Sequence, residues 1–173
     1  MDVFTIEDFL DESEVSKLLE FVDSEKENFH LHTRDSSAHI PYYDSSIQCR
    51  WFREKLNGML TQIVTALNRP MFKAEPALFE ATLSRNCLDT GKINRRHEIG
   101  FAYHFYTLPR QFTGGEMTYT DTRLDTVVTL LPKRNSINFY AANLVYQLTP
   151  TYGSDRYTIH GYLSKNCERL SRR

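Results

Sequence analysis

Alternating bulky and small residues in the middle of the chain place the strongest constraint on its fold. From residue 99 to residue 106, large apolar residues alternate with a second set, which consists of Gly100, Ala102, His104 and Tyr106. This period of two predicts a β-strand with one apolar face and one face that is small at first and polar at its end. Such a face suits a ligand pocket. Residues 113–115, Thr-Gly-Gly, predict a turn into a second strand.

Two amphipathic helices are predicted before this strand. Asp11 and Glu14 have the spacing of a capping box, and apolar residues follow at helical spacing up to Val22. A second apolar stripe begins after Ser45 and continues to Leu67, where Asn-Arg-Pro ends it. The polar segment between the helices predicts a loop with a short strand. We expect its three histidines to be solvated.

The second half of the chain consists of short segments with strand periodicity. Besides residues 98–107, strands are predicted at 77–84, after Gly115, and at 126–131, 136–140, 144–148 and 156–163. Helices followed by short strands predict an antiparallel double sheet, mainly β, with the helices packed on one outer face. We expect a single domain over residues 1–173, with a helical support region at 1–75 and a β core at 76–165.

Composition limits the partners of the chain. It has 173 residues, enough for one domain with a sizeable core, and its net charge is −1 from 21 basic and 22 acidic residues. This balance predicts no nucleic-acid partner and no membrane partner. The start lacks a secretory signal, no apolar stretch is long enough for a membrane helix, and three separated cysteines predict free thiols. We therefore expect a cytoplasmic protein.

The strand at 156–163 carries the most informative polar residues. Tyr157, Ile159 and Leu163 form its apolar set, which we expect to face the helices. Arg156, Thr158 and His160 alternate with them and should then point between the two sheets. An arginine aimed into that interior needs an anionic partner, because burial of an unpaired guanidinium is costly.

Two segments resemble a known enzyme family. The sequence YHFYTLPRQFTGGEM, from residue 103, and the late RYTIHGYL, from residue 156, resemble the prolyl 4-hydroxylase-like branch of the iron(II)/2-oxoglutarate oxygenases. The opening VFTIEDFLDESEVSKLLEFV is also similar to that branch. The resemblance covers nearly the whole chain. It implies a double-stranded β-helix, a cupin-like jelly roll with the pocket between its sheets.

The resemblance also implies an iron site, which this sequence does not supply in the usual form. The family has a His-x-Asp or His-x-Glu pair before the strand at 98–107 and a third histidine later in the chain. None of the six histidines here is followed two residues later by Asp or Glu. Tyr146 stands at the place of the third ligand. The family's iron-binding triad is therefore expected to be missing.

The sequence agrees better with the family at the residues that bind the co-substrate, 2-oxoglutarate. Arg156 stands where the family's arginine holds the distal carboxylate of 2-oxoglutarate, and His104 stands where many members have a tyrosine that binds the same carboxylate. Thr158 and Tyr103 are further candidates to bind an anion. A site that keeps its anion-binding arginine but lacks its metal ligands suggests a pocket with a changed use.

The first functional hypothesis is a redox-neutral enzyme or binding protein that uses the pocket without a cofactor, for a small or carrier-tethered anionic substrate. His104 would be a general acid or base, Tyr146 a proton or hydrogen-bond donor, and His160 a second base. Arg156 would hold the anion. The alternative for His104 is a buried histidine that is hydrogen-bonded to a neighbouring tyrosine.

Two other hypotheses stay open. One is an active iron(II)/2-oxoglutarate-dependent hydroxylase with non-standard ligands, which would need Fe(II) and 2-oxoglutarate. Its candidate ligands are His97, His104, His160, Asp89, Glu98 and Glu116. The other is a non-catalytic scaffold or interaction domain that keeps Arg156 for stability. The sequence leaves the substrate, the pathway and the oligomeric state open.

Overall fold

The computed structural model describes residues 3–25, 30–31, 38–41, 47–68, 78–85, 99–121, 123–141 and 144–164. Three helices precede most of the strands. They are α1 (Glu12–Ser24), α2 (Ile47–Gly58) and α3 (Leu60–Ala66). The strands are β1 (Val3–Ile6), β2 (His30–Leu31), β3 (Ala38–Pro41), β4 (Leu78–Arg85), β5 (Ile99–Phe105), β6 (Phe112–Gly114), β7 (Met117–Asp121), β8 (Thr126–Leu130), β9 (Ser136–Ala141), β10 (Val145–Leu148), β11 (Thr151–Gly153) and β12 (Tyr157–Ser164).

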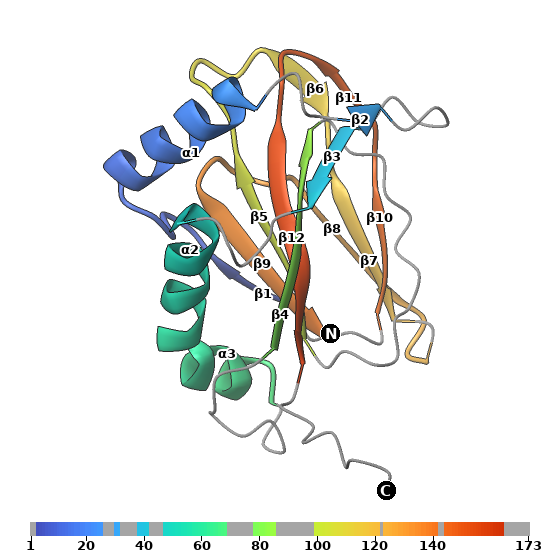
Figure 1. Ribbon diagram of the computed structural model, residues 1–173. Coiled ribbons are helices and arrows are strands. Elements are labelled where there is room, and N and C mark those ends of the chain that lie inside the picture. Colours follow the sequence, from blue (N-terminus) through green and yellow to red (C-terminus); the bar gives the residue numbers. More distant parts are fainter. Residues whose placement is uncertain are drawn as a thin grey trace, which may run out of the picture.

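Two facing antiparallel sheets form the core of the fold (Figure 1). The major sheet has seven strands in the order β1-β9-β5-β12-β4-β3-β2, and the minor sheet has three in the order β10-β7-β8. A short ladder of β11 and β6 lies at one end. The helices cover the outer face of the major sheet, as the sequence predicted, so its inner face is left to the interior between the sheets.

The helix side of the major sheet holds the larger apolar core. The apolar faces of α1, α2 and α3 pack there against alternate residues of β5, β9 and β12. Among its fully buried members are Val15, Leu18, Phe52, Leu56, Ile63, Phe101, Phe105, Phe139 and Ile159. Side chains alternate across a strand, so the intervening residues of β5, β9 and β12 face the minor sheet.

Most predicted elements are confirmed. Asp11 caps α1 through the predicted capping box, in which it accepts a hydrogen bond from the Glu14 backbone at 2.8 Å and Glu14 binds back to the Asp11 nitrogen at 2.8 Å. The second predicted helix is divided into two helices, α2 and α3. The helix is interrupted at Met59, just after Asn57 and Gly58, because these two residues are poor helix formers.

The sequence analysis did not predict several of the short strands. The turn predicted at residues 113–115 lies partly within β6, and β11 lies in a segment read as a loop. Because β1, β2 and β3 all join the major sheet, the expected division at residue 75 does not separate helices from sheet. Within the described part of the chain, no helix has the length and apolar character needed to cross a membrane.

Candidate functional site

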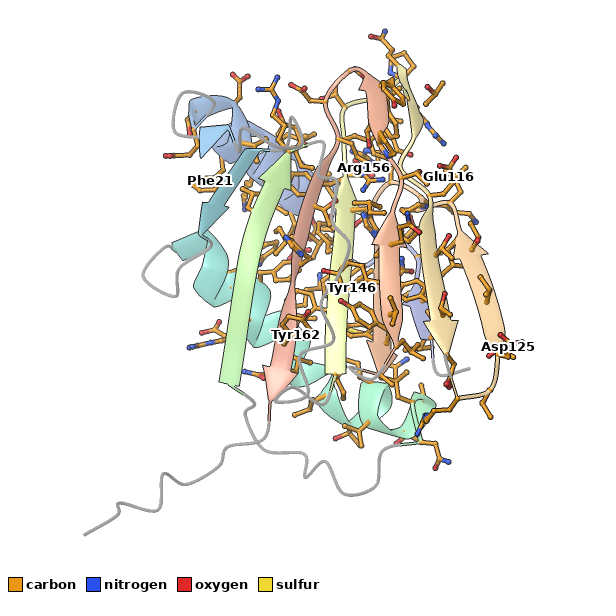
Figure 2. All side chains as sticks on the ribbon, turned by 90° about the vertical axis from the view of Figure 1, so that its right-hand side faces the viewer. Phe21, Glu116, Asp125, Tyr146, Arg156 and Tyr162 are labelled. Carbon is orange, nitrogen blue, oxygen red and sulfur yellow. The ribbon has the colours of Figure 1, made fainter. Side chains whose placement is uncertain are left out.

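Arg156 immediately precedes β12 of the major sheet, and its side chain contacts residues at both sheets. Its side chain is only 1% exposed. Nη1 donates to the carbonyl oxygen of Gly115 at 2.6 Å, and Nη2 contacts the hydroxyl of Thr158 at 3.4 Å. Gly115 lies just before β7 of the minor sheet, so the guanidinium spans the interior between the sheets. Figure 2 shows Arg156 and Glu116 at the same end of the barrel.

Gly115 makes room for the guanidinium. A Cβ atom built on this residue would overlap Nη1 of Arg156. Its φ angle is +80°, a conformation that side-chain-bearing residues rarely adopt. The Thr-Gly-Gly segment therefore has a structural role besides the predicted turn, and the local sequence does not indicate that role. The segment positions a backbone carbonyl against the buried arginine.

A ladder of polar side chains crosses the inner face of the major sheet. Thr158 pairs with His104 in the β12–β5 register, and Asn138 pairs with Thr5 in the β9–β1 register. His104 Nδ1 lies 3.3 Å from Thr158 Oγ1, and its Nε2 lies 3.5 Å from Asn138 Nδ2. Asn138 Oδ1 accepts from the Thr5 hydroxyl at 2.7 Å. These contacts connect Arg156 to Thr5 through four neighbouring strands.

The orientation of the Asn138 amide determines which nitrogen of His104 carries the proton. Because Asn138 Oδ1 accepts from Thr5, its Nδ2 faces His104 and donates to Nε2. With the amide in this orientation, the neutral ring would carry its proton on Nδ1, which lies 3.3 Å from Thr158 Oγ1. Burial holds the pKa of His104 well below its usual value, and the charge of Arg156 acts in the same direction. His104 is neutral near pH 7.

This environment does not suit the predicted acid–base role of His104. Its side chain is 0% exposed, and both ring nitrogens already have partners in the ladder. A general acid or base must reach the substrate, and this ring is fully buried with both nitrogens in contact with Thr158 and Asn138. The alternative of a buried, hydrogen-bonded histidine fits better, although its partners are Thr158 and Asn138 and not the tyrosines that were expected.

His160 and Thr158 share the inward face with His104. Strand parity places both there, and His160 acts electrostatically on His104. His160 is half-buried, so it is more accessible than His104. The predicted inward direction of Arg156, Thr158 and His160 therefore agrees with the structure, and His160 is more exposed than His104 on the same face.

Glu116 brings a negative charge to the same end of the barrel. Its carboxylate accepts a hydrogen bond from the Thr149 hydroxyl. That hydrogen bond lowers the pKa of Glu116, and the positive charges of Arg110 and Arg156 contribute in the same direction. The ionised carboxylate therefore partly offsets the charge of Arg156.

The space beside Gly100 is filled, which corrects the prediction that the small residues of β5 leave a hollow at that point. A Cβ atom on Gly100 would overlap the ring of Tyr140, so the small residue makes room for an aromatic side chain and not for a ligand. The Tyr140 ring lies 5.5 Å from that of Tyr146 and 5.1 Å from that of Tyr119. The other buried members of this cluster are Ala102, Met117, Ala141, Leu144 and Leu148.

Tyr146 belongs to this cluster and is 7% exposed. Figure 2 shows it midway along the barrel, away from Arg156. Its described surroundings are aromatic and apolar, and they do not place it against the anion that Arg156 would hold. The predicted role of Tyr146 as a donor in the same site is therefore not supported by its position.

Tyr103 lies on the wrong face for the anion-binding role that was expected. Its ring packs between Phe9 and Phe52 on the helix side of the sheet, with centroid distances of 5.7 Å and 5.4 Å. Its hydroxyl donates to Asn135 Oδ1 at 3.0 Å. Tyr103 thus supports the turn before β9. Strand parity alone separates it from His104.

The described residues do not fit the iron site that the fold implies. Among them, no group of three histidine, cysteine, aspartate or glutamate side chains is placed to hold a metal ion. Tyr146, at the position of the family's third ligand, is surrounded by tyrosine, methionine and leucine. Fe(II) of this type needs two imidazoles and a carboxylate. The candidates His97, Asp89 and Glu98 lie outside the described residues.

A cavity of about 280 Å³ lies outside the barrel, between α1 and the loops that follow β5 and precede β12. Leu19, Leu108 and Tyr157 are among its lining residues, and Arg156 and His104 are not. This cavity is therefore separate from the predicted pocket.

The sequence analysis missed three residues of the ladder and its surroundings. Asn138 follows Ser136 on the inner face of β9 and could have been found from strand parity. Thr5 depends on the pairing of β1 with β9, which brings together residues far apart in the sequence. The contact of Gly115 with Arg156 likewise gives no local sequence signal.

The comparisons with known proteins agree with this architecture. The sequence matches no protein-family model, and it has no significant match among curated proteins. Solved structures do match its fold. A prolyl 4-hydroxylase from Pseudomonas putida has a TM-score of 0.66 and 13% identity, with 95% of this chain and 92% of that chain covered.

Two further structures share the same arrangement. A Trichoplax adhaerens prolyl hydroxylase, solved with a peptide of hypoxia inducible factor, has a TM-score of 0.61 and 11% identity, covering 95% of this chain and 84% of that chain. The viral collagen prolyl hydroxylase of Paramecium Bursaria Chlorella virus-1, solved with 2-oxoglutarate, has a TM-score of 0.59 and 10% identity, with coverage of 95% and 96%. The chain therefore has the double-stranded β-helix fold of the prolyl 4-hydroxylase-like iron(II)/2-oxoglutarate oxygenases.

Proposed function

We propose that the barrel binds a small or carrier-tethered organic anion at Arg156 and Thr158 without a metal, as a binding protein or as a redox-neutral enzyme. The observation that carries the proposal is the buried guanidinium of Arg156, whose hydrogen-bond partners include the neutral oxygens of Gly115 and Thr158. A buried guanidinium favours an anion, and its planar fork suits a carboxylate or phosphate.

The proton arrangement around Thr158 supports the same site. Its Oγ1 accepts from Arg156 Nη2 at 3.4 Å and lies 3.3 Å from His104 Nδ1. If His104 carries its proton on Nδ1, the hydroxyl of Thr158 is left to donate to a bound anion. An ionised carboxylate accepts hydrogen bonds and donates none, so it matches the donors that Arg156 and Thr158 supply together.

A redox-neutral reaction would use His160. Two residues along a strand span about 6.6 Å, so His160 lies one side-chain length from an anion held at Thr158. A half-buried imidazole there could exchange a proton with a substrate atom a few bonds from the bound carboxylate. Addition, elimination or isomerisation next to a carbonyl requires no oxidant.

The experiment is a binding screen of organic acids, including 2-oxoglutarate, succinate, citrate and phosphorylated acids, by NMR in the presence of EDTA. We compare the wild type with Thr158→Val, which lacks the hydroxyl, and with Thr158→Ser, which keeps it. We expect Thr158→Val to weaken binding by about 1–3 kcal/mol and Thr158→Ser to retain it. Arg123→Ala, an exposed arginine far from the site, is the control.

Glu116→Gln provides a change in the opposite direction. Because its carboxylate partly neutralises Arg156, removal of that charge should tighten anion binding. Binding that is equal in the wild type, Thr158→Val and Glu116→Gln would place the anion elsewhere. If the wild type binds none of these acids, the scaffold hypothesis gains.

A further inference from the structure

The hydroxyl group of Thr151 is buried and has no hydrogen-bond partner among the described residues. Thr151 is the first residue of β11, and its Oγ1 atom is closed off from solvent although the residue as a whole is partly exposed. A buried hydroxyl that makes no hydrogen bond costs free energy, so such groups are rare in native proteins and need an explanation. The position calls for a partner that the described residues do not supply.

Thr149, two residues earlier, shows that the protein can satisfy a threonine hydroxyl in this segment. Its Oγ1 accepts a hydrogen bond from the Glu116 nitrogen at 2.9 Å and donates one to the Glu116 carboxylate. The Thr149 nitrogen also donates to the Glu116 carbonyl oxygen at 2.9 Å. The hydroxyl of Thr149 therefore joins the end of β10 to the start of β7, whereas that of Thr151 has no such role.

Thr151 Oγ1 lies beside the guanidinium of Arg156. A Cβ atom built on Gly115 would overlap Nη1 of Arg156 and would lie 3.2 Å from Thr151 Oγ1, so both groups border the same point. β11 pairs with β6 through Thr151 and Gly114. A Cβ atom on Gly114 would overlap the carbonyl oxygen of Pro150, so this glycine lets the segment approach closely. The two glycines thus bring the Thr151 hydroxyl to the buried guanidinium.

Two hydroxyl groups therefore flank the guanidinium from different parts of the fold. Thr158, on β12, lies 3.4 Å from Nη2, and Thr151, on β11, lies on the Nη1 side. An oxyanion bound to a guanidinium presents at least two oxygens, and each can accept more than one hydrogen bond. We propose that Thr151 is a third ligand of the anion, with its hydroxyl donating to one oxygen and that of Thr158 to another. This inference rests on the proposed function, because it concerns the anion held at Arg156 and Thr158.

The position of β11 gives the anion a route to these groups. The strand lies at one end of the barrel and, among the described strands, pairs with β6 alone (Figure 1). Tyr152 is 66% exposed and Gly153 is also exposed, whereas Arg156 is buried. An outward displacement of β11 separates few contacts and opens the space beside Thr151 Oγ1, and its return brings the hydroxyl onto the bound anion.

Thr151→Val tests the proposal because it removes the hydroxyl and keeps the size and branching of the side chain. The probes are succinate and inorganic phosphate, titrated separately by NMR into EDTA-treated protein, so that a carboxylate and a phosphate are distinguished. We expect Thr151→Val to weaken binding of the probe that the wild type binds by about tenfold or more. Thr151→Ser, which keeps the hydroxyl, should retain the affinity.

The stability of the free protein provides a second measurement that does not depend on a ligand. Thr151→Val should leave the midpoint of urea unfolding unchanged or higher, because it removes a buried hydroxyl that has no partner among the described residues. Thr149→Val is the matched control, since its hydroxyl is hydrogen-bonded within the protein and its loss should lower the midpoint. A ligand role for Thr151 thus predicts lower affinity without lower stability.

The possible failures are distinguishable. A wild type that binds neither probe would count against the anion site itself and would leave Thr151 without a ligand. Binding that Arg156→Ala abolishes and Thr151→Val leaves unchanged would keep the anion site and overturn the role of Thr151. A lower unfolding midpoint for Thr151→Val, similar to that of Thr149→Val, would also overturn it, because the hydroxyl would then have a partner within the free protein.

Discussion

Gly115 and Arg156 are fitted to each other across the interior of the barrel. The carbonyl oxygen of Gly115 accepts a hydrogen bond of 2.6 Å from the guanidinium, and the space beside its Cα is occupied by the same group. A methyl group added at Gly115 would therefore displace the Arg156 side chain without removing its charge. A substitution at Gly115 therefore tests the effect of the guanidinium's position separately from the effect of its charge.

Gly115→Ala should weaken anion binding and lower stability. Its φ angle of +80° is unfavourable for alanine, and strain of this kind costs about 1–3 kcal/mol. Chemical denaturation and calorimetry measure the two effects. Gly58→Ala is the control, because a Cβ there meets no atom within 4 Å. Gly115→Ala with unchanged affinity would show that the anion does not depend on the position of Arg156.

His104 should remain neutral down to low pH. Its pKa is lowered in the fold, whereas in the unfolded chain it should be near 6.5. As the pH falls below about 6.5, the unfolded chain therefore takes up the proton first, and the free energy of unfolding decreases by up to about 1.4 kcal/mol per pH unit from this group. The contribution is fully present above that pH.

His104→Gln should reduce this slope between about pH 6.5 and pH 5, as measured by urea unfolding. His160→Gln, on the same face of the sheet, is the comparison. In the wild type, the imidazole NMR signals of His104 should not titrate between about pH 8 and pH 5. A His104 signal with a midpoint near pH 6.5 would show that the imidazole reaches solvent and would restore its acid–base role.

Gly100→Ala should destabilise the chain through overpacking. The added methyl group overlaps the Tyr140 ring, and forced repacking of a filled core costs about 1–3 kcal/mol. In a Tyr140→Leu background the same change should cost less, because the ring is absent. Thermal unfolding of the four chains gives the coupling. If the two changes were additive, an open pocket over Gly100 would be the better description.

The purified protein should carry no stoichiometric iron and should not turn over 2-oxoglutarate. The reasons are the lack of any His-x-Asp or His-x-Glu pair and the aromatic surroundings of Tyr146. Elemental analysis and succinate release under aerobic Fe(II) test this. About one iron per chain, with oxygen-dependent succinate release, would support the oxygenase hypothesis with ligands outside the described residues.

Strand parity predicted the directions of the inward residues correctly. Arg156, Thr158 and His160 alternate with Tyr157 and Ile159, and one buried face fixes the register of such a strand. The capping box likewise located α1 because its signal is local. The short strands β6 and β11 escaped because three residues are too few to show a period.

The side chains that fill the space beside Gly100 could not be predicted from strand parity. Gly100 and Ala102 leave space on β5, but the side chains that enter it come from β9 and β10. Only the pairing of these strands and the distance between the sheets show that Tyr140 and Tyr146 occupy it. The burial of His104 has the same cause, since its partner Asn138 comes from a neighbouring strand.

Calorimetric titration of the organic-acid panel into EDTA-treated protein tests the central claim most directly. The wild type should bind at least one acid, and Arg156→Ala should weaken that binding by about 2–5 kcal/mol, the range for truncation of one partner of a buried charge pair. Arg156→Lys should recover only part of it, because the bidentate geometry is lost. Equal affinity of the wild type and both variants, or binding that appears only after Fe(II) is added, would contradict the account.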